Sequence, residues 1–274
     1  MKGKLFVVGT PIGNLADFSP RAIETLKEVD FIAAEDTRVT IKLLNKFQID
    51  TPMISYHKFS NFDRGDEICT RIENGENCAI VSDAGMPCIS DPGETLVKQC
   101  AERGITVCAV PGATALATAL AISGLPTGRF AFEGFLTVNK PNRHEHLLSV
   151  KNEERTMIFY EAPHKLAATL KDMYNMFGDR KISIVRELTK VHEEVIRTTL
   201  KNAAEMYADG SAKGEFVLVI EGAKHEKEEK EITLEYAVNL AKDLAQKGMS
   251  LSESAKEAAK LTGFKKGDIY KQLI

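Results

Sequence analysis

Short apolar runs recur along the first half of this 274-residue chain, and each is followed by a loop rich in glycine, proline or charged residues. The clearest runs are residues 5–8, 31–34, 78–81 and 106–110, with amphipathic helical patterns between them. Strands that alternate with helices in this rhythm predict βαβ units and a mainly parallel sheet. Because the carboxyl ends of parallel strands lie at the same edge of a sheet, we expect the loops that follow these strands to converge there.

The loop at residues 81–93 has the sequence V-S-D-A-G-M-P-C-I-S-D-P-G. Its glycines and prolines exclude a regular helix or strand. Residues 82–86 are not needed to start the next helix, so we expect them to contact a ligand. Residues 90–93 are explained as well by a helix start, with Ser90 or Asp91 as the cap.

A second α/β domain is expected at residues 137–223, after a first domain at residues 1–136. The boundary is placed after Leu136 because the chain turns polar there. Alternating residues at about 187–199 suggest antiparallel pairing, so this domain should contain a mixed sheet.

Residues 224–274 are expected to form a charged linker and a small helical tail. The run K-H-E-K-E-E-K-E at 224–231 predicts a solvated linker. Ser250 and Glu253 match a capping box at the start of one tail helix. The two last helices resemble a helix-turn-helix, but residues 232–274 carry seven lysines against five acidic residues. This weak positive charge favours an appendage that aids RNA or domain docking over a DNA reader.

Composition excludes several classes of protein. Hydrophobic residues make up 43% and charged residues 27% of the chain, as in ordinary globular proteins. The cysteines are odd in number (five) and show no C-x-x-C spacing, so we expect free thiols in a reducing cytoplasm, and no zinc. No apolar run approaches the roughly 20 residues of a membrane span. We therefore expect a cytoplasmic protein with no membrane and no metal partner.

Four loops should meet at the edge of the first sheet, namely Gly9–Asn14, Glu35–Arg38, Ser82–Met86 and Pro111–Ala115. The first lacks both the dinucleotide G-x-G-x-x-G pattern and the P-loop ending, which argues against NAD and ATP. Backbone groups from such loops suit a ligand that joins an amino-acid head to a nucleoside.

Seven motifs occur in order between about residues 4 and 221: V-G-T-P-I-G-N-L, A-E-D-T-R, S-D-A-G-M-P-C-I-S-D-P-G, V-P-G-A, S-G-L-P, F-E-G-F-L and E-A-P-H-K. Together they resemble the tetrapyrrole methylase superfamily, and within it the members that methylate a cytidine ribose 2′-hydroxyl of 16S rRNA in the decoding centre. The resemblance implies two α/β domains with a cleft between them, a small C-terminal helical appendage and a homodimer. It also implies an S-adenosylmethionine-dependent enzyme whose partner is 16S rRNA or the small ribosomal subunit.

The same resemblance implies which residues bind the cofactor. Loops of the first domain would line its methionine and ribose parts with Pro11, Ile12, Asp83, Gly85, Met86, Thr114 and Ala115. Strand ends of the second domain would enclose the adenine with Tyr160, Leu188, Phe216 and Val217.

A ribose hydroxyl is a weak nucleophile, so a general base or a desolvated, oriented site would help the transfer. The candidates for base or acceptor positioning are Glu35 and Asp36, with His57, Glu161 and Glu187 as further possibilities. A local Asp–Arg pair that caps the next helix explains the A-E-D-T-R motif as an alternative. Because a sulfonium methyl group is already activated, no metal is required.

The net charge of −3 gives no global attraction for RNA, so local cations would have to supply phosphate contacts. The candidates are Arg38, His57, Lys58, Arg64, Lys140 and Arg143. Each of them alone is equally explained as a solvated surface charge.

Two other functions compete with this interpretation. One is a porphyrinoid methylase of the same superfamily, which the first domain cannot distinguish. The other is a non-enzymatic, nucleoside-sensing regulator with a DNA-binding helical tail. The A-E-D-T-R motif, the basic loop near residue 140 and the tail favour RNA over a porphyrinoid. The regulator would require a tail more basic than +2 and would need no carboxylates in the cleft.

Overall fold

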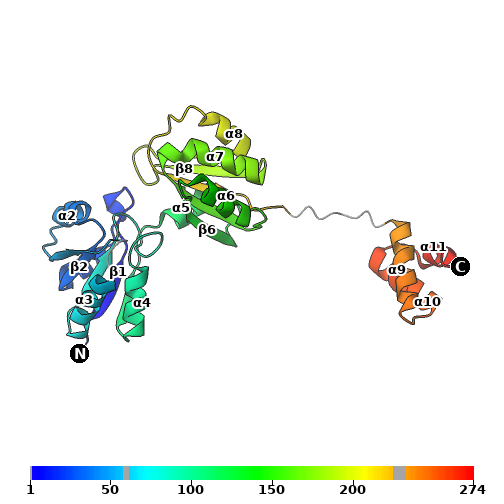
Figure 1. Ribbon diagram of the computed structural model, residues 1–274, viewed down its shortest axis with the longest axis horizontal. Helices are drawn as coiled ribbons and strands as arrows, with labels where there is room; N and C mark the ends of the chain where they lie inside the picture. Colours follow the sequence, from blue (N-terminus) through cyan, green and yellow to red (C-terminus); the bar gives the residue numbers. More distant parts are fainter. Residues whose placement is uncertain (1, 58–61, 225–232) are drawn as a thin grey trace. The chain divides into compact units, whose positions relative to one another are not determined.

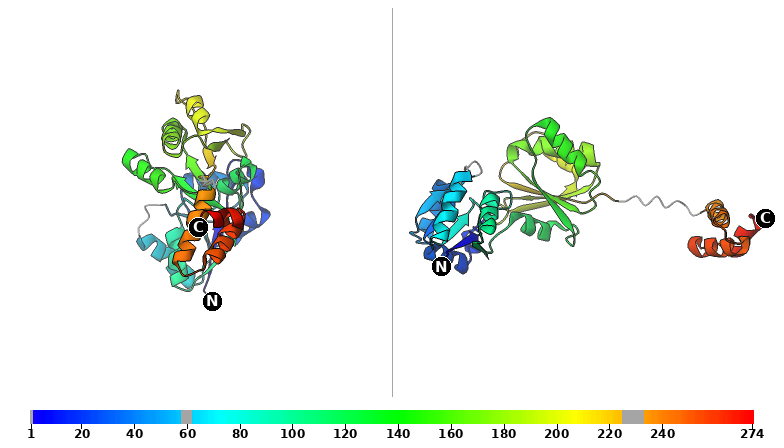
Figure 2. Two further views of the ribbon diagram at one scale, coloured as in Figure 1. Left: turned by 90° about the vertical axis from the view of Figure 1, so that its right-hand side faces the viewer. Right: turned by 60° about the horizontal axis from the view of Figure 1, so that its bottom comes forward.

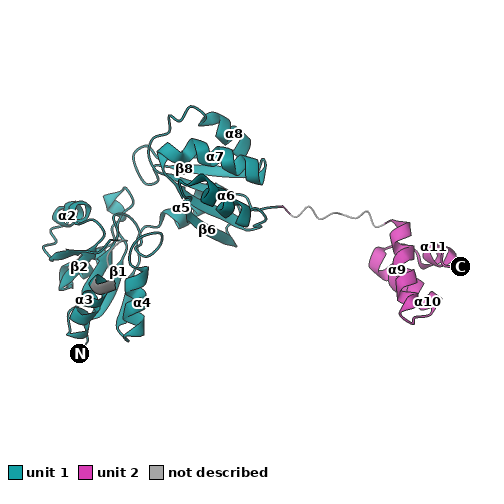
Figure 3. Ribbon diagram, viewed as in Figure 1, with its two compact units in different colours: residues 1–223 teal, residues 224–274 magenta. Residues whose placement is uncertain are grey.

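The computed structural model describes residues 2–57, 62–224 and 233–274 (Figure 1). The chain forms two compact units, residues 1–223 and residues 224–274 (Figure 3). Within the described residues, no helix is long and apolar enough to cross a membrane.

The first sheet is entirely parallel, as the sequence predicts, with strand order β3-β2-β4-β1-β5. Its strands are β1 (Lys4–Val8), β2 (Phe31–Ala34), β3 (Met53–Ser55), β4 (Cys78–Val81) and β5 (Thr106–Val110). The connecting helices are η1 (Leu15–Asp17, a 3-10 turn), α1 (Pro20–Glu28), α2 (Thr37–Lys46), α3 (Phe62–Glu73) and α4 (Glu94–Glu102). Every residue of β2 and β4 is buried, which explains why these strands are continuous apolar runs rather than alternating ones.

The second sheet is mixed, again as predicted, with order β6-β7-β10-β8-β9. Its strands are β6 (Phe130–Phe135), β7 (Thr156–Glu161), β8 (Lys181–Arg186), β9 (Glu194–Thr199) and β10 (Phe216–Ile220). β6 pairs with β7 in parallel, whereas β8 and β9 form the expected antiparallel pair. Four helices accompany the sheet: α5 (Ala115–Ser123), α6 (Lys140–Ser149), α7 (Pro163–Phe177) and α8 (Leu200–Met206).

These helices cover both faces of the second sheet (Figure 2). On one face, Ala119 and Leu120 of α5 pack against Ile158, Val185 and Val219. On the other face, buried side chains of α6, α7 and α8 share a core with β7, β8 and β10.

The change from one sheet to the other lies between β5 and β6. It therefore precedes the division expected after Leu136, because β6 already pairs with β7. Most of the polar stretch that suggested the division belongs to α6, whose N-cap Asn139 accepts the backbone N–H of Asn142.

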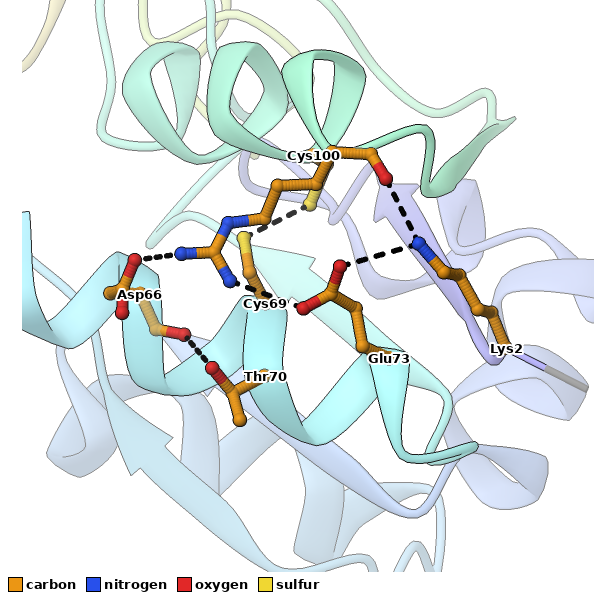
Figure 4. Close-up of polar contacts among 7 residues, drawn as sticks. Lys2, Asp66, Cys69, Thr70, Glu73 and Cys100 are labelled. Carbon is orange, nitrogen blue, oxygen red and sulfur yellow. Dashed lines mark hydrogen bonds and ion pairs between the residues drawn. The ribbon is translucent and has the colours of Figure 1, made fainter.

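A polar network ties the N-terminus to α3 and α4 (Figure 4). The Arg103 guanidinium pairs with the carboxylates of Asp66 and Glu73. The Lys2 ammonium lies 3.3 Å from Glu73 Oε1 and donates to the carbonyl of Arg103 at 3.0 Å. Partly exposed pairs of this kind contribute little individually, so their role is to fix how the two helices align.

The cysteines are free thiols, as the sequence predicts. Cys69 of α3 and Cys100 of α4 face one another in the core, with their sulfur atoms 3.6 Å apart (Figure 4). Within the described part of the chain, no group of His, Cys, Asp and Glu side chains could hold a metal ion.

The C-terminal unit contains α9 (Leu234–Gln246), α10 (Leu251–Thr262) and α11 (Lys266–Lys271). Its own small core consists of Ala237, Val238, Ala241, Ala255, Ala258 and Ile269. The predicted capping box is present, since Ser250 and Glu253 exchange both of its hydrogen bonds. Of the predicted linker at 224–231, only residue 224 lies within the described residues.

Substitution of Leu26 by Ala tests the packing of the first sheet. Leu26 of α1 is fully buried, so the loss of its side chain should lower the free energy of unfolding by about 2–5 kcal/mol. Leu15 is 44% exposed, and Leu15→Ala should cost no more than about 0.5 kcal/mol. Urea unfolding followed by circular dichroism compares the two variants, and equal losses would contradict this assignment of the core.

Candidate functional site

A cavity of about 620 Å³ lies where the ends of the two sheets of the first unit meet. Ligand pockets in proteins usually measure about 300–1,000 Å³. The first sheet and its loops contribute Ile12, Glu35, Asp83, Ala84, Gly85, Met86, Ile89, Asp91, Thr114 and Ala115. The second sheet and its loops contribute Phe135, Tyr160, Glu161, Ala162, Pro163, His164, Val185, Leu188, Glu215, Phe216 and Val217. The structure thus brings to one cavity every residue expected to bind a cofactor except Pro11, which is buried.

Three loops of the first sheet approach so closely that side chains would not fit between them. A Cβ atom on Gly9 would lie 2.6 Å from the Cα of Gly112, and one on Gly112 would lie 2.7 Å from Gly9. Thr10 donates its backbone N–H to the carbonyl of Gly85 at 2.9 Å, and Gly85 returns a bond of 3.2 Å. Gly85 has a φ of +85°, which glycine adopts readily and other residues rarely do. Backbone contacts therefore shape the floor of the cavity.

Glu35 and Asp83 brace the ends of the neighbouring strands β2 and β4. The backbone N–H of Asp83 donates to Glu35 Oε2 at 3.3 Å, and the N–H of Asp36 donates to Asp83 Oδ1 at 3.2 Å. Burial, followed by the negative charges of Asp83 and Asp36, raises the pKa of Glu35. Burial and the charge of Asp36 likewise raise the pKa of Asp83.

Asp36 caps α2, and this matches the alternative interpretation of the A-E-D-T-R motif. Its Oδ1 atom accepts the backbone N–H of Arg38 at 2.8 Å, and its carboxylate forms an ion pair with the Arg38 guanidinium at 2.6 Å. These hydrogen bonds lower the pKa of Asp36 to about 2. Asp36 does not line the cavity, whereas the adjacent Glu35 does. Of the two candidate bases, only Glu35 therefore occupies a suitable position.

The expectation that Ser90 or Asp91 caps the next helix is wrong. α4 begins at Glu94, and its N-cap is Gly93, which has a φ of +125° and no side-chain bond. The backbone at Cys88 and Ser90 is left-handed, with φ values of 71° and 65°. The loop therefore turns before the helix starts, and its aspartate is not used as a cap.

Asp91 lines the cavity instead, and sequence reasoning missed it. Burial, followed by the charge of Glu35, raises its pKa to about 6, although a hydrogen bond with Ser82 opposes the shift. The signal that could have identified it is the Ser-Asp dipeptide, which occurs in this loop at 82–83 and again at 90–91.

On the side of the second sheet, Tyr160 and Glu161 already have hydrogen-bond partners. The Tyr160 hydroxyl accepts the backbone N–H of Leu116 at 3.0 Å, and burial raises the pKa of this tyrosine. Glu161 is 2% exposed, pairs with Lys165 at 2.9 Å and accepts the hydroxyl of Thr169 at 2.6 Å. A carboxylate with these partners is poorly placed to accept a proton from a substrate.

Glu187, the other base considered in the second domain, does not line the cavity. It pairs with Lys190 at 2.9 Å and accepts the backbone N–H of Glu215 at the same distance. The bond with Lys190 lowers its pKa, so it holds its loop rather than serving as a base.

Arg143 does not present its charge at the surface. It is 8% exposed, and its guanidinium pairs with Asp172 at 2.7 Å. It also donates to the carbonyls of Thr137 and Val138. These contacts anchor the loop before α6, so the Arg143 guanidinium is not available to bind an RNA phosphate.

The other candidate RNA contacts differ in their surroundings. Arg64 pairs with Glu67 and donates to the carbonyl of Ser55. Lys58 lies outside the described residues. The exposed candidates are Arg38, His57 and Lys140.

Comparison with known proteins shows similarity along nearly the whole chain. Residues 4–204 match the family model described as Tetrapyrrole (Corrin/Porphyrin) Methylases. The chain is 48% identical over 269 residues to ribosomal RNA small subunit methyltransferase I of Synechocystis sp., covering 98% of this chain and 96% of that protein. It is 47% identical over 220 residues to the protein of the same name from Thermotoga maritima, covering 80% of this chain and 99% of that protein.

Solved structures of low sequence identity share the fold. One is the uroporphyrin-III C-methyltransferase of Thermus thermophilus complexed with S-adenosylhomocysteine. It superposes with a TM-score of 0.55 at 16% identity, covering 80% of this chain and 92% of that one.

The raised pKa of Asp91 predicts that Asp91→Asn stabilises the protein at high pH. A carboxyl whose pKa moves from 3.8 to about 6 on folding contributes stability that is fully present below pH 3.8 and is lost as the pH rises through 6. The gain in unfolding free energy for Asp91→Asn should therefore be larger at about pH 8 than at about pH 4.5. Urea unfolding at the two pH values measures this difference.

Asp36→Asn is the matched control for this measurement. The stability that Asp36 contributes is lost only as the pH falls from its ordinary 3.8 towards about 2. The effect of Asp36→Asn should therefore be nearly the same at both pH values. A gain for Asp91→Asn that does not depend on pH would show that the carboxylate is not destabilised in the folded protein.

Proposed function

Because this chain belongs to the tetrapyrrole (corrin/porphyrin) methylases, we propose that it is an S-adenosylmethionine-dependent methyltransferase that acts on 16S ribosomal RNA. The observation that carries the choice of substrate is similarity over at least 96% of their length to relatives named ribosomal RNA small subunit methyltransferase I. The likeness to a porphyrin methylase, by contrast, is one of fold.

The cavity fits such a cofactor. Its volume of about 620 Å³ falls in the range of small-molecule sites, and its lining combines apolar side chains with a few polar groups. Leu188, Phe216 and Val217 offer an apolar surface for a flat base. Asp83 and the backbone of the loops at Ile12 and Thr114 offer hydrogen bonds for a ribose and an amino-acid head. When bound, S-adenosylmethionine supplies a methyl group on a positively charged sulfur.

The chain's own groups bind, orient and desolvate the reactants. An in-line transfer needs the acceptor oxygen about 3 Å from the methyl carbon, so the rigid contact between the glycine loops matters for rate. Glu35 faces the cavity with a raised pKa, in a position to orient an acceptor hydroxyl. No protein-bound metal is needed for this chemistry.

The acceptor atom, the oligomeric state and the cellular location are proposed from the resemblance to rRNA methyltransferases. The acceptor would be the 2′-hydroxyl of a cytidine in the decoding centre, and the enzyme would work as a homodimer in the cytoplasm. The exposed side chains Arg38, His57 and Lys140 would contact phosphates of the RNA.

Labelled S-adenosylmethionine tests the reaction directly. Incubation with 30S subunits or naked 16S rRNA should place label in the RNA, and Asp83→Ala should abolish it because Asp83 lines the cavity and braces β2 against β4. No transfer to either form of RNA, together with tight binding of a tetrapyrrole, would favour the porphyrinoid alternative. No transfer to any acceptor, with specific binding of DNA by the tail, would favour the regulator.

Binding of S-adenosylhomocysteine, measured by calorimetry, tests the site without turnover. Gly9→Ala should weaken binding by at least about tenfold, because a methyl group at Gly9 forces the Gly112 loop away. Gly128→Ala is the matched control and should bind normally, since its Cβ would meet no atom within 4 Å. Normal binding by Gly9→Ala would mean that the close approach of these loops does not shape the cofactor site.

A further inference from the structure

Two large apolar side chains that line the cavity remain open to solvent. Ile89 is 43% exposed and Phe135 is 54% exposed. By contrast, Leu188, Phe216 and Val217, which line the same cavity, are each at most 7% exposed. Exposed apolar groups inside a concave site mark a place where a ligand completes the burial.

The two exposed side chains come from segments that touch one another. A Cβ atom on Gly134, the neighbour of Phe135, would lie 3.3 Å from the hydroxyl of Ser90, the neighbour of Ile89. The Phe135 ring also packs edge-on against Tyr160, with the centroids 5.4 Å apart. The Lys165 ammonium lies 5.7 Å from the Phe135 centroid. Phe135 is thus held in place while half of its surface stays open.

Asp91 lies in the same loop as Ile89 and faces the same cavity. The titratable groups near it are Glu35 and Asp83 from the first sheet, Cys88 from its own loop and Tyr160 from the second sheet. On the side of the second sheet, Glu161, His164 and Glu215 line the same cavity. The two charges that act on its pKa, those of Glu35 and Asp83, are both negative. The Asp91 carboxylate is therefore open to a donor supplied by a ligand.

The two other carboxylates that the first sheet brings to the cavity also hold backbone groups of the neighbouring strand ends. Glu35 already accepts the backbone N–H of Asp83, and Asp83 accepts that of Asp36. The hydrogen-bond partner of Asp91 is the Ser82 hydroxyl, and its pKa of about 6 is close to physiological pH. A general base works best when its pKa lies near the working pH.

Building on the proposed methylation of RNA, we propose that Ile89, Asp91 and Phe135 form the subsite for the acceptor nucleotide. The base of a single-stranded nucleotide stacks on the open face of Phe135, with Ile89 beside it. The Asp91 carboxylate accepts a hydrogen bond from the ribose hydroxyl. Stacking of an unpaired base on an aromatic side chain is the usual way in which proteins hold single-stranded RNA.

These groups are sufficient for methyl transfer to the ribose hydroxyl. The hydroxyl oxygen forms a bond to the methyl carbon of the sulfonium donor as the carbon–sulfur bond breaks. The electron pair of that bond stays on sulfur, which becomes a neutral thioether. The hydroxyl proton passes to the Asp91 carboxylate, which later releases it to water.

The stacking role is tested by steady-state kinetics with the full-length protein and whichever form of 16S rRNA it methylates. Phe135→Leu should raise the KM for RNA by about 5- to 100-fold. Phe135→Trp keeps an aromatic ring, so its KM should stay near that of the wild type. Phe130→Leu is the matched control, because Phe130 lies on the same strand, is 40% exposed and does not line the cavity. Calorimetric binding of S-adenosylhomocysteine should be unchanged in all three variants.

The base role is tested by the dependence of kcat on pH. In the wild type, kcat should rise with pH through about 6, as Asp91 loses its proton. Asp91→Asn should lower kcat by about 10²- to 10⁴-fold, abolish that rise and leave S-adenosylhomocysteine binding intact. Asp50→Asn is the control, since Asp50 is exposed and lies outside the cavity.

The outcomes separate the two proposals. If the wild type methylates RNA but Asp91→Asn keeps its kcat and pH profile, or Phe135→Leu keeps its KM, the acceptor subsite is refuted and the proposed function stands. If the wild type methylates no RNA, both are refuted. Loss of S-adenosylhomocysteine binding in Asp91→Asn would assign this residue to the donor instead, and would also refute the subsite.

Discussion

The close approach of the Gly9, Gly112 and Gly85 backbones is the constraint on which the cavity depends. The first two leave no room for a Cβ atom, and Thr10 and Gly85 exchange backbone hydrogen bonds across the same junction. Because main-chain atoms make these contacts, the loops keep one geometry without long side chains. The side chains that remain can then face the ligand, where they are useful for binding and transfer.

Three carboxylates that line the cavity are costly to ionise in the folded protein, although ionised carboxylates are useful for binding and proton transfer. Glu35, Asp83 and Asp91 occupy one partly buried region, and burial raises the pKa of each. The charge of Glu35 adds to the shift of Asp91, which makes ionisation of the group costly. Acidic groups held close together in a cleft with raised pKa values are typical of sites that transfer protons or bind polar ligands.

The residues that line the cavity all belong to the first unit and lie between Ile12 and Val217. The C-terminal unit has its own alanine-rich core, to which α9, α10 and α11 contribute. The Thermotoga maritima relative is matched over 99% of its length by 220 residues, or 80%, of this chain.

The sequence by itself determined the parallel sheet, the antiparallel pair β8–β9, the free thiols and the capping box at Ser250, because each depends on local pattern. Together with its resemblance to a family, it also indicated most residues of the cavity, since parallel strands must end on one side of a sheet. Tertiary structure decided what the pattern could not. Arg143 is a buried partner of Asp172, and β6 joins the second sheet. Asp91 faces the cavity rather than capping a helix, because left-handed backbone at Cys88 and Ser90 turns the loop before α4 begins. These facts depend on contacts between distant residues, which no local pattern records.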